Sequence, residues 1–126
     1  MAFKKVATGL QHIGIPTNDY DKTLKFYTAL GFEVIYETVN NGEKVAFMKL
    51  GDLVIETYQN FKAAGINGAV DHIAINVTDV DEARRIADEM KLEVIEADQL
   101  PFFENGVKYF TILGPNHEKL EFNQYL

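Results

Sequence analysis

The chain of 126 residues has the length of one compact domain, and 47% hydrophobic and 25% charged residues are the composition of a globular protein. Nineteen acidic residues against twelve basic ones give a formal net charge of −7, which argues against broad binding to nucleic acid or to an anionic membrane. The absence of cysteine excludes disulfides, thiolate metal sites and a cysteine nucleophile. A bound metal ion would therefore need histidine nitrogen and carboxylate oxygen as ligands.

The N-terminal segment contains Lys4 and Lys5 but no apolar run with the length of a signal peptide. No segment of the chain has the length of a membrane-spanning helix. We therefore expect a cytoplasmic protein that has neither a membrane nor nucleic acid as a partner.

The two halves of the chain repeat one pattern. Residues 10–36 align with residues 70–96 at a constant offset of 60, and the tripeptide Val54-Ile55-Glu56 matches Lys119-Leu120-Glu121. The identical pairs at this offset are His12/His72, Ile13/Ile73, Ile15/Ile75, Asp19/Asp79, Asp21/Asp81, Glu33/Glu93, Val34/Val94 and Ile35/Ile95. A repeat of this kind decides the architecture. We predict a single domain over residues 1–126, with module 1 at about 9–60, a linker at 61–69 and module 2 at about 70–126.

In chain order, the first copy begins with an alternating strand at residues 10–16. Asn18 or Asp19 then caps a helix that continues to Gly31, a residue typical of a helix end. Strands separated by turn residues are predicted next, at 32–38, 43–50 and 52–59.

The second copy follows the same plan. A strand at residues 70–77 leads to Thr78 or Asp79 as the cap of a second helix. Three more strands are predicted at 92–98, 106–113 and 118–124. The pattern is βαβββ twice over, and the fold class is α+β.

Both repeated histidines leave the apolar face of their strand. Because successive strand residues point to opposite faces, His12 lies opposite Ile13 and Ile15, and His72 lies opposite Ile73 and Ile75. The residue two positions after each histidine is small, which keeps space open beside the imidazole.

Two glutamates also lie at equivalent positions of the repeat. Glu56 interrupts an apolar strand, where a lone carboxylate is costly unless a cation or strong hydrogen-bond donors meet it, and Glu121 is its counterpart. His12, Glu56, His72 and Glu121 together offer two imidazoles and two carboxylates, a set that suits a divalent Zn, Ni, Co, Mn or Fe ion. Four such ligands leave an octahedral ion two open positions for a substrate.

A structural role is the alternative for each of these residues taken singly, because a strand histidine is more often a hydrogen-bonded residue than a ligand. The chain has three histidines, and two of them fall at equivalent positions of the repeat, which favours the metal site. His117 lies in a turn without a counterpart in the first half, and we interpret it as a residue of the surface or the rim.

Five motifs of the chain are together similar to those of one protein family. They are Leu10-Gln11-His12-Ile13-Gly14-Ile15, Leu24-Lys25-Phe26-Tyr27 with Leu30-Gly31-Phe32, Val54-Ile55-Glu56, Val70-Asp71-His72-Ile73-Ala74, and Gly114-Pro115-Asn116 with Lys119-Leu120-Glu121. Over essentially the whole chain, this set resembles the vicinal oxygen chelate superfamily, which includes glyoxalase I, methylmalonyl-CoA epimerase, extradiol dioxygenases and the fosfomycin- and bleomycin-resistance proteins. The resemblance implies a curved mixed sheet, or half-barrel, around a metal cavity, with the four family ligand positions on the two histidines and two glutamates above.

Among family members, the His/Glu/His/Glu set is most similar to glyoxalase I of the lactoylglutathione lyase type. The resemblance implies a metal-dependent lyase or isomerase that removes a proton next to a chelated carbonyl, with Glu121 as the first candidate base and Glu56 as the second. It also implies that Asn60 contacts a thiol cofactor. Phe102 and Phe103, in an apolar loop, are candidates for the lining of the cavity, although they equally fit a place in the core.

The chain departs from the glutathione-dependent pattern at one position. Such enzymes usually carry an arginine four residues after the first histidine ligand, and this chain has Pro16 there. Residues 42–52 are as similar to methylmalonyl-CoA epimerase, which typically has glutamine at the position of Glu56. Bleomycin-resistance proteins, which sequester a small molecule without catalysis, are a further alternative. We expect a small-molecule substrate and a homodimer.

Overall fold

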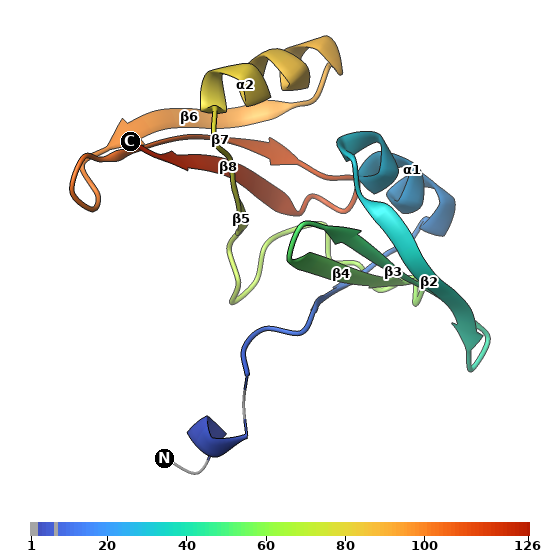
Figure 1. The fold of residues 1–126 in the computed structure, drawn as a ribbon. Helices are drawn as coiled ribbons and strands as arrows, with labels where there is room; N and C mark the ends of the chain where they lie inside the picture. Colours follow the sequence, from blue (N-terminus) through green and yellow to red (C-terminus); the bar gives the residue numbers. More distant parts are fainter. Residues whose placement is uncertain (1–2, 7) are drawn as a thin grey trace. The chain divides into compact units, whose positions relative to one another are not determined.

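The computed structural model describes residues 3–6 and 8–126, which form two compact units, residues 1–63 and residues 64–126 (Figure 1). The boundary between the units falls inside the segment 61–69, the predicted linker. Each unit is described separately below. None of the helices among the described residues is long and apolar enough to cross a membrane.

Unit 1 has one helix and one four-stranded sheet after a short 3-10 helix, η1 (Phe3–Lys5). The elements are β1 (Ile13–Pro16), α1 (Tyr20–Leu30), β2 (Glu33–Asn40), β3 (Glu43–Leu50) and β4 (Leu53–Tyr58). The strand order is β1-β4-β3-β2, with β1 parallel to β4 and the other neighbours antiparallel.

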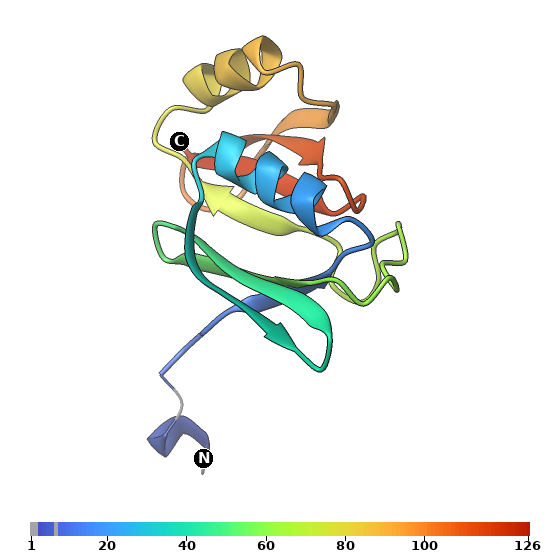
Figure 2. The same ribbon diagram turned by 90° about the vertical axis from the view of Figure 1, so that its right-hand side faces the viewer.

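Unit 2 repeats this topology. Its elements are β5 (Ile73–Asn76), α2 (Val80–Glu89), β6 (Val94–Leu100), β7 (Val107–Leu113) and β8 (Lys119–Tyr125), in the sheet order β5-β8-β7-β6. The repeat extends to an irregularity in the pairing, since the register shifts between Val34 and Tyr36 in β2 and between Val94 and Glu96 in β6. The predicted α+β fold of two βαβββ modules is confirmed, and Figures 1 and 2 show each helix beside the sheet of its own unit.

Both helices are held at their first residues in the same way. The side chains of Asp19 and Asp79 accept hydrogen bonds from the backbone N–H three residues later, each at 3.0 Å, so aspartate is the cap in both copies. The backbone N–H of the first helical residue donates to the side chain of Gln59 in unit 1, at 2.8 Å, and of Gln124 in unit 2, at 2.9 Å. Gly31 ends α1 with a left-handed backbone (φ 108°), as predicted.

The core of each unit lies between its helix and one face of its sheet. In unit 1, Tyr27 of α1, Met48 of β3 and Ile55 of β4 are fully buried; in unit 2, Ile112 and Leu120 are. Strand alternation directs the neighbours of these residues, including Glu56 and Glu121, to the opposite face. One face of each sheet is therefore packed against the helix, and the opposite face carries polar side chains.

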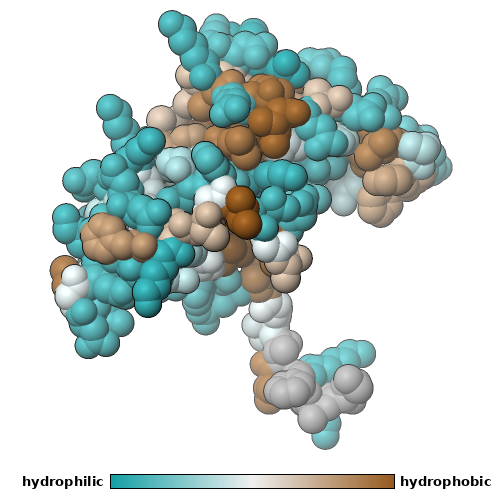
Figure 3. Space-filling view, turned by 180° about the vertical axis from the view of Figure 1, so that it is seen from behind, coloured by the Kyte–Doolittle hydropathy of each residue, from teal (hydrophilic) through white to brown (hydrophobic). Residues whose placement is uncertain are grey.

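Hydrophilic surface predominates on the side of the molecule drawn in Figure 3, where hydrophobic surface is confined to patches. Over the whole described chain, the large hydrophobic side chains with the greatest exposure include Val6, Leu10, Ile66, Val70 and Phe103. These side chains are distributed over both units.

We predict that Asp79→Ala destabilises the chain by about 1 kcal/mol, because α2 loses the acceptor for one of its free N–H groups. The free energy of unfolding from urea titration followed by circular dichroism measures the effect. Asp79→Asn, which keeps a capping oxygen, is the control and should lie within a few tenths of a kcal/mol of the original chain. Equal losses in both variants would contradict the capping role.

Candidate functional site

In unit 1, the parallel pairing of β1 with β4 brings a histidine and a glutamate together. Gly14 lies opposite Glu56 in the register, and His12 precedes it by two residues on the same face. His12 Nε2 lies 3.4 Å from Glu56 Oε1, and both side chains are about one-third to one-quarter exposed (33% and 26%). The pair is thus accessible from solvent.

Unit 2 holds the equivalent pair. Ala74 lies opposite Glu121, and His72 Nε2 is 3.7 Å from Glu121 Oε1. The Glu121 side chain is 12% exposed, which makes it the more enclosed of the two carboxylates. The repeat in the sequence therefore corresponds to a repeated arrangement in the structure, a histidine beside a glutamate in each unit.

The other ring nitrogen of each histidine has a fixed partner. His12 Nδ1 lies 2.9 Å from Gln11 Oε1, and His72 Nδ1 lies 2.8 Å from Asp71 Oδ2. In both copies this contact at Nδ1 leaves Nε2 facing the glutamate. Metal-binding histidines are held in the same way, by a hydrogen bond at the ring nitrogen that does not contact the metal.

The donor set fits a divalent ion of the kind predicted. Each pair combines an imidazole nitrogen with a carboxylate oxygen, 3.4 Å apart in unit 1 and 3.7 Å apart in unit 2. Two ligands of one ion lie about 3 to 3.5 Å apart, a separation that the first pair matches and the second slightly exceeds. Within residues 3–6 and 8–126, the structure brings potential ligands together in pairs and forms no cluster of three or more. The assignment of the four residues as metal ligands stays a prediction.

Aromatic side chains surround the pair in unit 1. The ring of Phe47 meets the imidazole of His12 edge-on, with 5.5 Å between centroids, and Tyr36 lies next to Phe47 at 6.2 Å. A Cβ atom at Gly14 would lie 3.5 Å from the ring of Tyr58 and 3.7 Å from Glu56 Oε1. The small residue predicted to keep space open beside the histidine therefore lies against the carboxylate.

Unit 2 has a pocket of about 380 Å³ at its pair. The residues that line it are Asp71, His72, Glu96, Leu100, Phe102, Val107, Tyr109, Thr111, Lys119, Glu121 and Asn123. Three carboxylates face one lysine in this set, so the pocket is acidic. Leu100, Phe102 and Val107 supply an apolar wall.

Hydrogen bonds orient the acidic groups of this pocket. Asn123 Nδ2 donates to Glu121 Oε2 at 3.0 Å, which leaves Oε1 toward His72. The hydrogen bond from His72 and the ammonium of Lys119 hold the pKa of Asp71 below its usual range. The hydroxyl of Tyr109 donates to Glu96 at 2.6 Å, and this bond, together with burial and the Glu96 charge, raises the pKa of Tyr109 to about 12.

The remaining predicted residues have different surroundings. Phe102 lines the pocket of His72 and Glu121, whereas Phe103 lines a neighbouring hollow of the loop between β6 and β7 and meets Tyr125 edge-on at 5.0 Å. Asn60 follows β4, and its side chain accepts a hydrogen bond from the backbone N–H of Lys62 at 2.9 Å. His117 Nδ1 lies 2.7 Å from the carbonyl of Gly65, in a contact between two turns.

The sequence did not predict three features of this pocket, which are Asp71, Asn123 and the pair of Glu96 and Tyr109. Asp71 adjoins the histidine, and Asn123 follows Glu121 by two residues on the same strand face, so both carried a positional signal. The pair of Glu96 and Tyr109 carried none, because it joins two strands and has no counterpart in the first half at the position of Val45.

Comparison with known proteins connects this geometry to a family. The profile of the Glyoxalase/Bleomycin resistance protein/Dioxygenase superfamily matches residues 9–122. The chain belongs to this superfamily. The protein YwbC of Bacillus subtilis (strain 168) is 30% identical in an alignment that covers 94% of this chain and 99% of YwbC.

Solved structures of the superfamily share the fold. The glyoxalase family protein from Enterococcus faecalis is 23% identical, with a TM-score of 0.77 over 98% of this chain and 99% of its own. Lactoylglutathione lyase from Agrobacterium tumefaciens is 19% identical, with a TM-score of 0.73 over 94% of this chain and 95% of its own. At these identities the likeness establishes the fold and leaves the reaction open.

We predict that Glu96→Gln lowers the pKa of Tyr109 toward the ordinary value of 10.0. The substitution removes a carboxylate that accepts a hydrogen bond from the hydroxyl and whose negative charge disfavours the phenolate. NMR titration of ring-labelled tyrosine measures this pKa. Since the folded pKa is raised, the stability that the group contributes should be lost between about pH 10 and about pH 12 in the original chain. Glu37→Gln, which alters a different tyrosine–glutamate bond, that of Tyr20 in unit 1, is the control and should leave the Tyr109 titration unchanged.

Proposed function

We propose that the chain is a metal-dependent enzyme of the glyoxalase I type, a lyase or isomerase that removes a carbon-bound proton next to a carbonyl group. The observation that carries the proposal is the repeated pair of a histidine and a glutamate, in which the imidazole has its Nδ1 held and its Nε2 directed at the carboxylate. Membership of the superfamily supports the same reading.

The ligands of the proposed ion are His12, Glu56, His72 and Glu121, and the ion is Zn, Ni, Co, Mn or Fe. The charge of the unit 2 pocket supports a cation, because Asp71, Glu96 and Glu121 outnumber Lys119. When bound, such an ion supplies Lewis-acid polarisation, which lowers the pKa of a carbon acid whose oxygens it chelates.

Glu121 is the first candidate for the base that moves the proton. It is largely enclosed, and Asn123 donates to its Oε2, which leaves Oε1 oriented toward His72. Tyr109 stays protonated at neutral pH, and Leu100, Phe102 and Val107 give one side of the pocket an apolar lining. Glu56 is the second candidate base, in the half of the chain with aromatic neighbours.

Two residues bear on the thiol of the substrate. Asn60 is a candidate contact for it, and Pro16 lies where glutathione-dependent enzymes usually have an arginine. A thiol other than glutathione therefore belongs in any substrate panel. Proton abstraction next to a thioester, as in methylmalonyl-CoA epimerase, would use the same groups without a free thiol.

We predict that protein purified without an affinity tag takes up about one divalent ion per chain, as measured by elemental mass spectrometry after loading and desalting. His12→Ala and His72→Ala should each weaken uptake by tenfold or more, since each removes one ligand and leaves its partner carboxylate uncompensated. His117→Ala removes the remaining histidine and is the matched control, with unchanged uptake. Absence of stoichiometric uptake of all five metals would exclude the metal site.

We predict turnover of methylglyoxal in the presence of at least one low-molecular-weight thiol, followed by thioester absorbance. Glu121→Gln should lower kcat by about a hundredfold or more, because a positioned base contributes at least that factor. Glu93→Gln, at an exposed carboxylate of the strand region before β6, is the control. Proton exchange in short 2-acyl-CoA thioesters without thiol-dependent turnover would favour the epimerase reading, and binding without either reaction would favour a sequestering protein.

We expect a homodimer, as is frequent in the superfamily. Light scattering after size-exclusion chromatography measures the mass directly.

A further inference from the structure

Asp71 contacts groups from three parts of unit 2. Its Oδ2 lies 2.8 Å from His72 Nδ1, on the residue that follows it. Its Oδ1 accepts a hydrogen bond from the side-chain amide of Asn67, before β5, and lies 3.4 Å from the ammonium of Lys119 in β8. Each carboxylate oxygen therefore has partners of its own, and together they fix the orientation of the carboxylate beside the imidazole.

A carboxylate and an amide differ in what they require of a neighbouring imidazole. An ionised carboxylate only accepts hydrogen bonds, so the bond with Asp71 requires the proton of neutral His72 to be on Nδ1. In unit 1, Gln11 has the equivalent position, with its Oε1 2.9 Å from His12 Nδ1. A glutamine side chain carries an NH₂ group beside its oxygen, and by turning over it can donate to the same nitrogen. Gln11 is therefore compatible with both tautomers, whereas Asp71 selects one.

The neighbours of the two histidine–glutamate pairs differ in the same direction. Lys119, which holds Asp71, has the position of Val54 in unit 1. Asn123, which donates to the ligand candidate of β8 at 3.0 Å, has the position of Tyr58. Polar groups thus orient both members of the pair in unit 2, whereas an aliphatic and an aromatic side chain have these positions in unit 1.

We propose that unit 2 provides the stronger half of the metal site and that Asp71 is the positioning residue that makes it so. Asp71 holds neutral His72 with its proton on Nδ1, so that Nε2 is free to bind the ion beside Glu121. The negative charge behind the ring also raises the basicity of the imidazole more than a neutral amide does. The inference rests on the proposed function, in which His72 and Glu121 are ligands, and adds that the two half-sites contribute unequally.

The tautomer of His72 is the first readout, and it is measured on the metal-free protein. Long-range ¹⁵N–¹H correlation spectra, recorded at a pH at which the imidazoles are neutral, should show the His72 proton on Nδ1. Asp71→Ala should shift this proton to Nε2, and the two ring nitrogens should then change places between the protonated and the unprotonated chemical-shift range. Asp71→Asn keeps an oxygen acceptor and should restore the original tautomer in part. His117, whose Nδ1 lies 2.7 Å from the carbonyl of Gly65, is the internal reference and should not change.

Zinc affinity, measured by competition with a chromophoric chelator, is the second readout. Asp71→Ala together with Lys119→Met removes a carboxylate and an ammonium, so the net charge of the pocket is unchanged and the positioning of His72 is lost. This double variant should weaken zinc binding by about tenfold or more, the usual cost of removing the partner of a metal-binding histidine. Gln11→Ala, the equivalent change in unit 1, should weaken zinc binding severalfold less.

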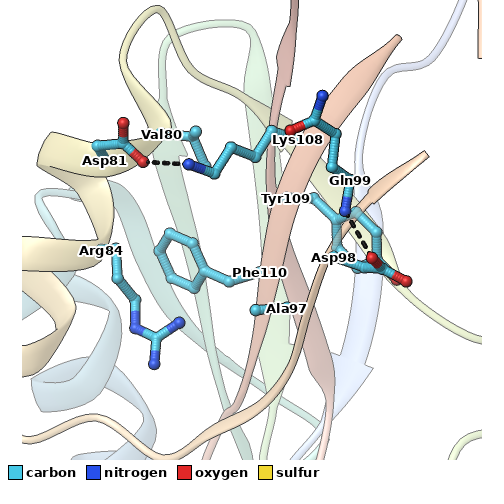
Figure 4. A pocket seen from close by; sticks show the side chains of 9 residues that line it. All are labelled: Val80, Asp81, Arg84, Ala97, Asp98, Gln99, Lys108, Tyr109 and Phe110. Atoms are coloured by element: carbon cyan, nitrogen blue, oxygen red, sulfur yellow. Dashed lines mark hydrogen bonds and ion pairs between the residues drawn. The ribbon is translucent and has the colours of Figure 1, made fainter. Parts of the chain in front are cut away.

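A matched control lies on the other face of the unit 2 sheet, in a pocket between α2 and the strands β6 and β7 (Figure 4). There Asp81 pairs with Lys108 at 2.7 Å, and the described residues that line this pocket include no histidine. Asp81→Ala with Lys108→Met removes the same two charged groups as the test variant and should leave zinc affinity unchanged. The dispersion of the amide spectrum checks the fold of every variant.

The outcomes separate this proposal from the proposed function. Equal zinc affinities in the test and control double variants, or an equal loss in Gln11→Ala, would overturn the proposal. Ordinary zinc binding with a His72 tautomer that Asp71→Ala leaves unchanged would remove the role of Asp71 and leave the metal site in place. Absence of zinc binding by the original chain would instead contradict the proposed function, and the inequality of the half-sites would fail with it.

Discussion

The parallel register between the first and last strand of each unit is the constraint on which the candidate site depends. It sets Gly14 opposite Glu56 and Ala74 opposite Glu121, so that the histidine two residues earlier shares a face with the carboxylate. A slip of one residue would move the whole set to the helix side, where Ile55 and Leu120 are fully buried. Core packing and site geometry are therefore enforced by the same pairing, and neither can change alone.

Placing a glutamate in such a strand has an electrostatic cost that each unit offsets locally. Glu121, the more enclosed of the two, faces the imidazole of His72 and receives a hydrogen bond from Asn123. Asp71 in turn contacts the far nitrogen of that imidazole, with 2.8 Å between Nδ1 and Oδ2. The result is a chain of oriented groups that ends in an imidazole nitrogen and a carboxylate oxygen, which is a suitable half-site for a cation. The two units differ in what surrounds this half-site, since aromatic rings adjoin it in unit 1 and polar groups in unit 2.

Sequence periodicity predicted most of the framework, because the signals involved are local or repeated. The order of elements, the aspartate caps and Gly31 follow from residues that act within a few positions of each other. The first strands were expected from residues 10 and 70 but begin at Ile13 and Ile73, where β4 and β8 supply partners. The bond between Tyr109 and Glu96 could not be predicted, since it joins two strands across a hairpin and has no equivalent in the repeat. Side-chain pairing of this kind depends on the register between two strands, which the sequence alone does not give.

The duplicated framework explains how one unit can exchange side chains without losing its fold. The groups that hold each helix in place are the aspartate cap, the glutamine of the last strand and the buried residues beneath, and all of these are matched between the units. The side chains of Tyr20 and Glu37 contribute one hydrogen bond and a filled volume, but they do not set the register or the caps. Their replacement by Val80 and Ala97 therefore leaves the framework intact. Phe110, which stands where unit 1 has Ala46, fills the space from the sheet, so that Val80 and Phe110 are 4% and 2% exposed. The duplicated framework thus tolerates the exchange of a large side chain between helix and sheet, because the volume of the core is kept while its members change.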